Sequence, residues 1–343
     1  MKKTNVIQFG LGPIGLESIK LAAEQSWLEV RGGVDIDPAK IGKTLGELTG
    51  VAALGGAKVF PSLDALFAAV GAPDVMLHTA GSKATASFAQ MRPALERGIS
   101  VASTCEELIF PTLKTPELAA EFDALCKRTG ARVVGTGVNP GFVMDVLPIC
   151  LTGVSRDVRS IYVERVVNAS TRRRPLQAKI GSGQNPDEFK ARFAAGTAGH
   201  AGFQQSVALL AHTMGWKLEE IKETCEPVVA TSRVVTQYFD VAPGQSLGIH
   251  QCCVGLVGGE ARIMLDLQMY LDAPNPHDAI LIQGRPQLNA VLHGGVAGDD
   301  ATVAALVNLI SRLLASRPGV RLMTELALPA WRNPLSESAK AAG

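Results

Sequence analysis

Several features that mark particular classes of protein are scarce in this 343-residue chain. Lysine and arginine together number 33 against 32 aspartates and glutamates, which gives a formal net charge of +1. A chain with so little excess charge lacks the basic surface that holds nucleic acid or an anionic membrane. The basic run Arg172–Arg174 is too short to change this. We therefore expect neither nucleic acid nor a membrane among its partners.

Long apolar runs and ordered cysteine patterns are also missing. No segment approaches the roughly 18 consecutive apolar residues of a membrane-spanning helix, and Met1–Thr4 precedes a predicted strand without the apolar stretch of a signal peptide. The six cysteines are scattered without CxxC spacing, and none stands at a familiar metal-ligand spacing from a histidine. The sequence thus predicts free thiols in a reducing compartment, a cytoplasmic protein and no bound metal.

The first part of the chain has a regular alternation of strands and helices. With 47% apolar residues, the chain is long enough for two domains with cores. Strands separated by helices of about 10–15 residues indicate βαβ units and a parallel sheet. The predicted strands are 5–10, 28–35, 74–79, 99–103 and 132–135, and the predicted helices are 14–24, one starting at Ser62, 83–97 and 116–129.

The pattern changes after Asn139-Pro140-Gly141. A long strand (160–169) and two helices (186–195 and 201–214) are followed by mostly strands up to residue 291, including a hairpin around Gly258-Gly259. An amphipathic helix over 300–316 is predicted to return to the first domain. We therefore predict an α/β fold in two domains. Residues 1–140, completed by about 298–343, form a Rossmann-type doubly wound parallel sheet, and residues 141–297 form an α+β substrate domain on a mostly antiparallel sheet.

A dinucleotide fingerprint lies between the first predicted strand and helix. In Gly10-x-Gly12-x-x-Gly15, the first glycine permits a tight turn, the second lets a pyrophosphate approach, and the third allows close packing of helix on strand. The helix that begins at Pro13 and Ile14 would direct amide donors and its positive dipole at the phosphates. The same glycines could also form a turn in an unrelated α/β fold.

Asp35, at the end of the second predicted strand, lies twenty residues after Gly15. A carboxylate there accepts hydrogen bonds from an adenosine ribose and repels a 2′-phosphate, which favours NAD over NADP. Lys40 and Lys43 follow closely and offset part of that repulsion, so NADP use stays open. In a competing interpretation, Asp35 only caps the next helix.

The third predicted strand ends in small residues that suit a loop close to the cofactor. Thr79 and Gly81 are assigned to cofactor binding on this basis. His78 precedes them, but its neighbours Val75–Leu77 are apolar, which favours a hydrogen-bonded core histidine over a catalyst.

Glu106 and Glu107 follow the apolar strand 99–103, where loops of such folds carry ligands and chemistry. A carboxylate at this position would hold the ammonium group of an amine and accept its proton. Loss of that proton frees the nitrogen lone pair, which must drive hydride loss from the neighbouring carbon. The competing interpretation is a helical first turn in which both glutamates complement the dipole.

Two further segments contain candidate ligand-binding residues. Asn139 and Pro140 lie at the predicted domain junction, where Asn139 would contact the nicotinamide amide or the substrate and Pro140 the substrate. A plain interdomain turn explains them as well. His200 stands where the N-cap of the next helix is expected, either facing substrate or as a solvated cap residue.

Together these segments resemble the 2,4-diaminopentanoate dehydrogenases and the related native amine dehydrogenases. That group is similar in fold to dihydrodipicolinate reductase. The likeness runs over nearly the whole chain, and its most specific segment is Gly135–Asp145. The other matching segments are Gln8–Gly15, Val34–Pro38, Ser103–Leu108, Gly199–Gly202 and Gly294–Asp299.

The resemblance implies NAD(P)-dependent oxidative deamination of an amine to a ketone and ammonia, or the reverse reductive amination. It also implies a homodimer formed through the second domain, and it places a catalytic glutamate at Glu106 or Glu107. Glu106 is preferred because it stands nearer the strand end. Ala201 and Gln204-Gln205 depart from the smaller apolar and acidic residues expected in the diamino-acid enzymes.

Two other functions remain open at this point. One is an imine reductase of the dihydrodipicolinate reductase type, which would act on a preformed C=N bond. The other is a non-catalytic NAD(P)-sensing protein, against which the two glutamates argue.

Overall fold

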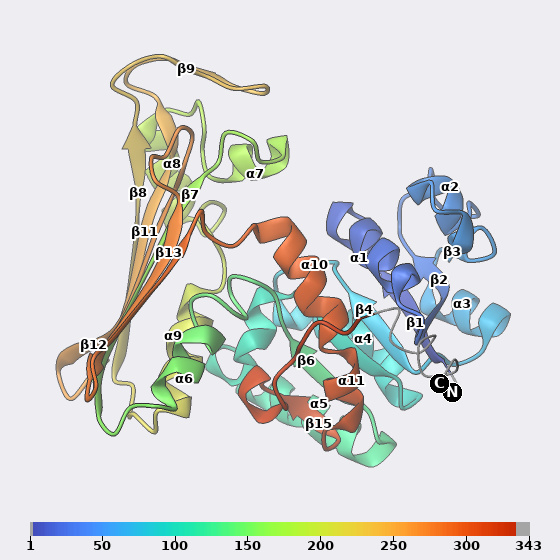
Figure 1. The fold of residues 1–343 in the computed structure, drawn as a ribbon. Coiled ribbons are helices and arrows are strands. Elements are labelled where there is room, and N and C mark those ends of the chain that lie inside the picture. The colour runs from blue at the N-terminus through green and yellow to red at the C-terminus, as the bar shows by residue number, and fades with distance from the viewer. Residues whose placement is uncertain (1–2, 334–343) are drawn as a thin grey trace, which may run out of the picture. The chain divides into compact units, whose positions relative to one another are not determined.

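The computed structural model describes residues 3–333 of the chain (Figure 1). They form two compact units. Unit 1 contains the residues up to Gly141 and those from Ala297 onward, and unit 2 is Phe142–Val296.

Unit 1 is built on a parallel sheet of seven strands in the order β15-β6-β5-β4-β1-β2-β3. The order runs outward in both directions from the neighbours β1 and β4, so the sheet is doubly wound and its switch point lies between them. The Rossmann-type fold class is thereby confirmed. The strands are β1 (Thr4–Phe9), β2 (Leu28–Val34), β3 (Lys58–Phe60), β4 (Val75–His78), β5 (Ser100–Ser103), β6 (Arg132–Gly135) and β15 (Gly319–Arg321).

Helices connect these strands and bury their apolar faces against the sheet. Phe88 and Phe122 stack at a ring-centroid distance of 4.2 Å and join two of them in the core. The helix expected over 300–316 is divided at Leu309, whose backbone (φ −80°, ψ −17°) stays close to helical, so the buried apolar side continues to Leu313. The helices are α1 (Pro13–Glu24), α2 (Leu45–Thr49), α3 (Leu63–Val70), α4 (Ala84–Glu96), α5 (Pro116–Thr129), α10 (Gly298–Asn308) and α11 (Ile310–Ala315); the short 3₁₀ turns are η1 (Ala52–Leu54), η2 (Glu106–Ile109), η3 (Pro111–Leu113) and η4 (Met323–Glu325).

Unit 2 is built on a six-stranded sheet in the order β14-β13-β7-β12-β11-β8. Its pairings are antiparallel except that of β12 with β7, so the mostly antiparallel sheet is confirmed. The expected hairpin joins β11 to β12 through Gly258 and Gly259, which both have positive φ. The strands are β7 (Val158–Asn168), β8 (Glu220–Val229), β11 (Ser246–Val257), β12 (Glu260–Tyr270), β13 (His277–Gly284) and β14 (Leu288–His293), and β9 (Val234–Val235) pairs separately with β10 (Asp240–Val241).

One face of this second sheet contacts helices. A Cβ on Gly255 would lie 2.7 Å from Cγ1 of Val207, so helix α9 packs on that face of β11. The helices are α6 (Val146–Thr152), α7 (Arg174–Lys179), α8 (Pro186–Ala194) and α9 (Phe203–Thr213). Among the described residues no helix is long and apolar enough to cross a membrane.

Helix α9 corrects one expectation. Its N-cap is Gly202 at φ +99°, a left-handed conformation that suits glycine, and not His200. His200 therefore lies two residues before the cap, in the preceding loop.

Candidate active site

The carboxyl ends of β1, β4, β5 and β6 meet at one edge of the unit 1 sheet. Backbone hydrogen bonds continue the ladder just past the strands, from Thr79 N to Phe9 O at 2.9 Å and from Thr136 N to Ser103 O at 2.8 Å. This edge therefore brings together the loops that contain Gly10, Thr79, Glu106 and Asn139. In doubly wound sheets ligands bind in this position.

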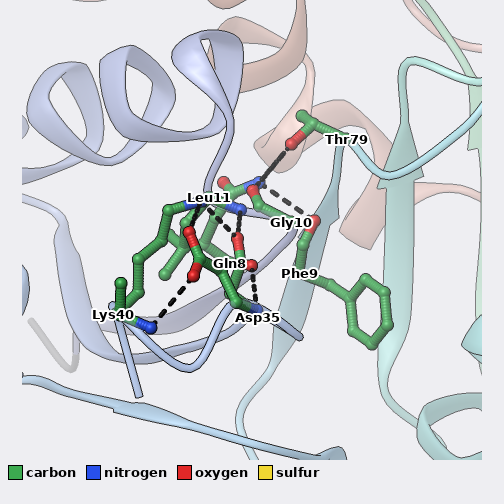
Figure 2. Close-up of polar contacts among 9 residues, drawn as sticks. Gln8, Phe9, Gly10, Leu11, Asp35, Lys40 and Thr79 are labelled. Carbon is green, nitrogen blue, oxygen red and sulfur yellow. Dashed lines mark hydrogen bonds and ion pairs between the residues drawn. The ribbon is translucent and has the colours of Figure 1, made fainter. Parts of the chain in front are cut away.

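Protein atoms contact two of the three glycines in the turn after β1, and Figure 2 shows the contacts of the first of them, Gly10. Gly10 adopts φ +86°, and its carbonyl oxygen accepts hydrogen bonds from Thr79 Oγ1 at 2.9 Å and Gln8 Nε2 at 3.1 Å. A Cβ on Gly15 would fall 2.0 Å from that same oxygen. Gly10 and Gly15 are thus needed for the turn and for the close approach of α1.

Gly12 is different, because a Cβ there would meet no protein atom within 4 Å. Its backbone is extended, and it caps α1 without any side-chain hydrogen bond to the helix. Pro13 occupies the first helical position and Ile14 follows it. Open space in front of an uncapped helix N-terminus fits the pyrophosphate of a dinucleotide, which binds there through amide donors and the helix dipole.

Asp35 follows β2 and is tied to the glycine turn. One carboxylate oxygen accepts hydrogen bonds from Leu11 N at 2.7 Å and Lys40 Nζ at 3.1 Å, and the other from Asp37 N at 2.9 Å (Figure 2). Burial would raise the pKa of Asp35, but the bonds from Asp37, Leu11 and Lys40 outweigh it and hold the pKa below its usual value. The carboxyl is therefore ionised at neutral pH.

The alternative role for Asp35, capping the next helix, is wrong. That helix is α2, and its N-cap is Thr44, which forms a capping box with Glu47. The carboxylate of Asp35 instead orients the glycine turn, which is the position from which an acidic residue reaches the adenosine ribose.

The loop after β4 contains Thr79 and Gly81, the latter at φ +145°. His78 is fully buried at the end of β4, with Nδ1 2.9 Å from Ser103 Oγ and Nε2 2.8 Å from Gln90 Oε1. Burial lowers the pKa of His78 to about 4, against the opposing effect of Gln90. The imidazole is therefore neutral and belongs to the core, as the sequence predicts.

The two glutamates after β5 have different surroundings. The Glu107 carboxylate accepts a hydrogen bond from Ala84 N, the first residue of α4, at 2.8 Å and pairs with Lys83 Nζ at 3.1 Å. Its side chain is only 10% exposed. Glu107 thus stabilises the N-terminus of helix α4 rather than that of turn η2, to which it belongs. Glu106 is half-buried and begins turn η2.

The loop after β6 is pressed against turn η2. A Cβ on Gly135 would lie 2.4 Å from the carbonyl carbon of Leu108, and one on Gly141 would lie 2.4 Å from Gly137 N. Asn139 in this loop has a buried Nδ2 without a hydrogen-bond partner, and Pro140, joined to it by a cis peptide bond, is buried. An unpaired buried donor costs about 1–3 kcal/mol, and a hydrogen-bond acceptor on a ligand would offset that cost.

Sequence reasoning missed Thr136, the first residue after β6. Its side chain is buried and its Oγ1 has no hydrogen-bond partner. Its position directly after a predicted strand, where loops of such folds contact ligands, is the sequence feature that would have indicated it.

In unit 2, His200 is held by Gln251. The His200 amide donates to Gln251 Oε1 at 2.7 Å, and its carbonyl accepts from Gln251 Nε2 at 2.9 Å. Burial, followed by the charge of Lys179, lowers the pKa of His200 to about 3, so the ring is neutral. Its Nδ1 lies 3.0 Å from the carbonyl of Ala201 and therefore carries the proton, which leaves Nε2 as an acceptor.

Two polar features of unit 2 were not foreseen. The side chain of Gln205 is buried with Nε2 unpaired, while Gln204 donates to Glu223 at 2.7 Å. Arg165 of β7 and Asp278 of β13 form a buried ion pair with an N–O distance of 3.5 Å. A charged residue within an alternating strand resembles a surface position, so the sequence alone does not indicate this pair.

Comparison with known proteins agrees with this architecture. The family model described as the 2,4-diaminopentanoate dehydrogenase C-terminal domain matches residues 142–340. The chain is 34% identical to the 2,4-diaminopentanoate dehydrogenase of Acetoanaerobium sticklandii over 280 residues, covering 78% of this chain and 79% of that protein.

Solved structures show the same fold. The amine dehydrogenase of Mycobacterium smegmatis superposes with a TM-score of 0.85 at 21% identity, covering 96% of this chain and 98% of that one. The dihydrodipicolinate reductase of Paenisporosarcina sp. TG-14 gives a TM-score of 0.51 at 14% identity, covering 92% and 96%.

The fold and the glycine turn define the dinucleotide-binding class of doubly wound α/β proteins, here with a second domain on a mostly antiparallel sheet. Within that class, the chain belongs to the 2,4-diaminopentanoate dehydrogenase family, and it is an oxidoreductase. The resemblance read from the sequence is confirmed. The family implies a nicotinamide dinucleotide, and the open space at Gly12, the ionised Asp35 and the unpaired amide of Asn139 fit that group.

Proposed function

We propose that the protein is an NAD(P)-dependent amine dehydrogenase that deaminates an amine to its ketone and ammonia, or runs the reverse reductive amination. The substrate is a 2,4-diaminopentanoate-like amino acid or a simple amine. The observation that carries the proposal is that the two glutamates after β5 have different positions and contacts. Glu107 caps α4, and Glu106 begins turn η2 at the strand edge where we place the dinucleotide. Membership of the family supports the reaction class.

Several residues would hold the cofactor, which supplies a hydride acceptor when bound. The backbone N–H groups of Gly12, Ile14 and Gly15 would bind the pyrophosphate, helped by the dipole of α1, while Pro13 starts the helix without a donor of its own. Asp35 would accept from the adenosine ribose, and the loop with Thr79 and Gly81 would contact the nicotinamide. Asn139 donates its unpaired Nδ2–H to the carboxamide.

Glu106 would hold the substrate ammonium group and take one of its protons. The freed lone pair on nitrogen then assists departure of hydride from the adjacent carbon, leaving an iminium ion. Water adds to that carbon and loses one proton to solvent, which gives a carbinolamine. Glu106 then returns its proton to the nitrogen, and ammonia leaves as the C=O bond forms and the hydroxyl proton passes to solvent. General-base assistance of this kind is worth about 10²–10⁴-fold in rate. Asn139, Pro140 and the Nε2 acceptor of His200 are our candidates for orienting the substrate.

A matched pair of variants tests the assignment of the base. Glu106→Gln should lower kcat by about 10²–10⁴-fold while NADH still binds, because only the proton acceptor is lost. Glu107→Gln should keep turnover within a few-fold but lower Tm, because the charged cap of α4 is weakened. If Glu106→Gln retains more than a tenth of wild-type kcat, Glu106 is not the base.

The same assay separates the competing functions. Reduction of a ketone with NAD(P)H should require ammonium, whereas an imine reductase would turn over a preformed cyclic imine without it. Tight NADH binding without turnover of any short diamino acid, amino acid or simple amine, with either cofactor at alkaline pH, would instead point to a sensing protein.

We also propose NAD as the preferred cofactor, a homodimer and a cytoplasmic location. Asp35 supports NAD, although Lys40 pairs with it and reduces the local negative charge. The face of the second sheet opposite α9 supports dimerisation, because it contains half-buried apolar side chains such as Val254 and Met264. The six cysteines are all free, which suits a reducing compartment. Sedimentation of wild type and Met264→Asp tests the dimer.

A further inference from the structure

His250, Cys252 and Asp266 gather on the face of the second sheet that does not contact α9. Residues two apart on a strand point to the same side, so His250 and Cys252 lie on one face of β11 while Gln251 and Cys253 are buried on the other. Asp266 of β12 stands directly opposite Cys252 in the strand register. A ligand atom from each of the three lies within 4.8 Å of the other two.

The separations between these atoms suit one small metal ion. His250 Nε2 lies 2.9 Å from Asp266 Oδ1 and 3.4 Å from Cys252 Sγ. With bonds of about 2.0–2.3 Å, a tetrahedral zinc ion holds N–O and N–S ligand pairs roughly 3.3–3.6 Å apart. The two pairs that include His250 would need to open by only a few tenths of an ångström, and the register of β11 on β12 already brings the third ligand to the same place.

The charge around the cluster is also favourable for a cation. Glu164 of β7 neighbours Asp266 in the sheet, and it accepts a hydrogen bond from Tyr162 Oη at 2.9 Å and lies 3.3 Å from His277 Nε2. Over residues 3–333, neither Asp266 nor Glu164 is paired with a lysine or arginine. Two adjacent carboxylates on a half-buried face therefore lack a permanent positive charge.

We propose that His250 Nε2, Cys252 Sγ and an Asp266 carboxylate oxygen form a binding site for a divalent transition-metal ion, with Zn²⁺ as the best match. Thiolate, imidazole and carboxylate together suit zinc better than magnesium or calcium, which prefer oxygen ligands alone. Water completes the coordination. The sequence predicts no metal because its cysteines and histidines lack the CxxC and zinc-finger spacings. The present set instead combines two residues that are two positions apart on one strand with a third residue on the neighbouring strand.

Binding of the metal ion should release a proton from Cys252. An ordinary cysteine thiol carries its proton at neutral pH, whereas a metal ion binds the thiolate. The ion forms a bond to sulfur and displaces that proton to the buffer, without any oxidation or reduction. Each bound ion should therefore release at least one proton.

The test uses the untagged full-length protein after removal of metals with EDTA. Titration calorimetry with ZnCl₂ in buffers of different ionisation enthalpy should give one ion per chain and at least one proton released. Co²⁺ should produce a thiolate-to-metal charge-transfer band in the near ultraviolet. Cys252→Ser and Asp266→Asn should each weaken Zn²⁺ binding by at least about 100-fold, and Cys252→Ser should abolish the band.

Cys150→Ser is the matched control, because this thiol is exposed at the end of α6 and outside the cluster. Circular dichroism and a cooperative thermal transition like that of wild type report that each variant is folded. The proposal is overturned if the folded wild type does not bind Zn²⁺, or if Cys252→Ser binds it as tightly as wild type. The cluster would then be only a histidine–aspartate hydrogen bond beside a cysteine. If Cys252→Ser fails to fold, the cobalt band of wild type and the Asp266→Asn titration decide.

Discussion

Adding one methyl group to Gly12 and to Gly15 should have opposite consequences. At Gly15 the new Cβ would lie 2.0 Å from the Gly10 carbonyl oxygen and 2.9 Å from Thr79 Oγ1. The first of these is a backbone atom, so α1 and the turn after β1 must separate by about 1.4 Å to move this contact from 2.0 Å to the 3.4 Å of ordinary van der Waals contact. Overpacking of this kind costs about 1–3 kcal/mol or more.

At Gly12 the same methyl group would meet nothing within 4 Å, and φ is −68°. Reduced entropy of the unfolded chain favours alanine by about 0.4–1 kcal/mol. Glycine is a better N-cap than alanine, and this difference favours glycine by a similar free energy. The two effects nearly cancel, so stability should hardly change. The methyl group would, however, occupy the space of the pyrophosphate, and we expect NADH to bind at least about tenfold more weakly, or about 1.4 kcal/mol.

The assay pairs thermal unfolding with fluorescence titration of NADH. Gly15→Ala should lower Tm by about 2–12 °C, because a cost of about 1–3 kcal/mol corresponds to roughly 2–4 °C for each kcal/mol in a domain of this size. Gly12→Ala should leave Tm within about 2 °C and lose affinity. Unchanged NADH affinity in a folded Gly12→Ala variant would show that the dinucleotide does not bind at the start of α1, and would refute the reasoning.

Three further predictions concern single residues. Asp35→Ser should lower the preference for NAD over NADP by at least about tenfold, because the repelling carboxylate is removed and Lys40 is released toward a 2′-phosphate; an unchanged ratio of kcat/KM values would contradict this. Asn139→Asp, which removes the unpaired Nδ2–H without changing shape, should weaken NAD(P) binding or lower kcat by about tenfold, and unchanged kinetics would exclude a ligand contact. His78 should make stability depend on pH. Its folded pKa of about 4 lies below the unfolded value near 6.5, so the unfolded chain binds more protons between these values, and stability falls as pH drops through that window, by about 3 kcal/mol at most. Urea unfolding at pH 7 and pH 4.5 should show this loss in wild type and a smaller one in His78→Gln.

Most of unit 1 was predictable because its signals are local. Strands such as Arg132–Gly135 and helices such as Pro116–Thr129 contain their own apolar pattern and end signals, and they were placed to the residue. Strands β3 and β15 were missed, because three residues are too few to show a period and only pairing with β2 and β6 makes them strands.

The candidate site was predictable in the identity of its residues and less so in their roles. The sequence indicates two glutamates after a strand, but the contact of Glu107 with Ala84 joins residues far apart in the chain. The same holds for the neighbours Cys252 and Asp266, which only the register of β11 on β12 brings together. Such contacts depend on tertiary structure, and no local pattern encodes them.

The cap that Glu107 places on α4 also couples two loops mechanically. The Glu107 amide donates to Ser82 O at 3.3 Å while its carboxylate accepts from Ala84 N, so the segment after β5 is tied in both directions to the segment after β4. Thr79 and Gly81 on one side and Glu106 on the other should therefore move as one rigid piece. A substitution that shifts either loop would disturb the proposed nicotinamide contact and the proposed base together. Adaptation to a new amine is then expected at positions outside this linked pair of loops.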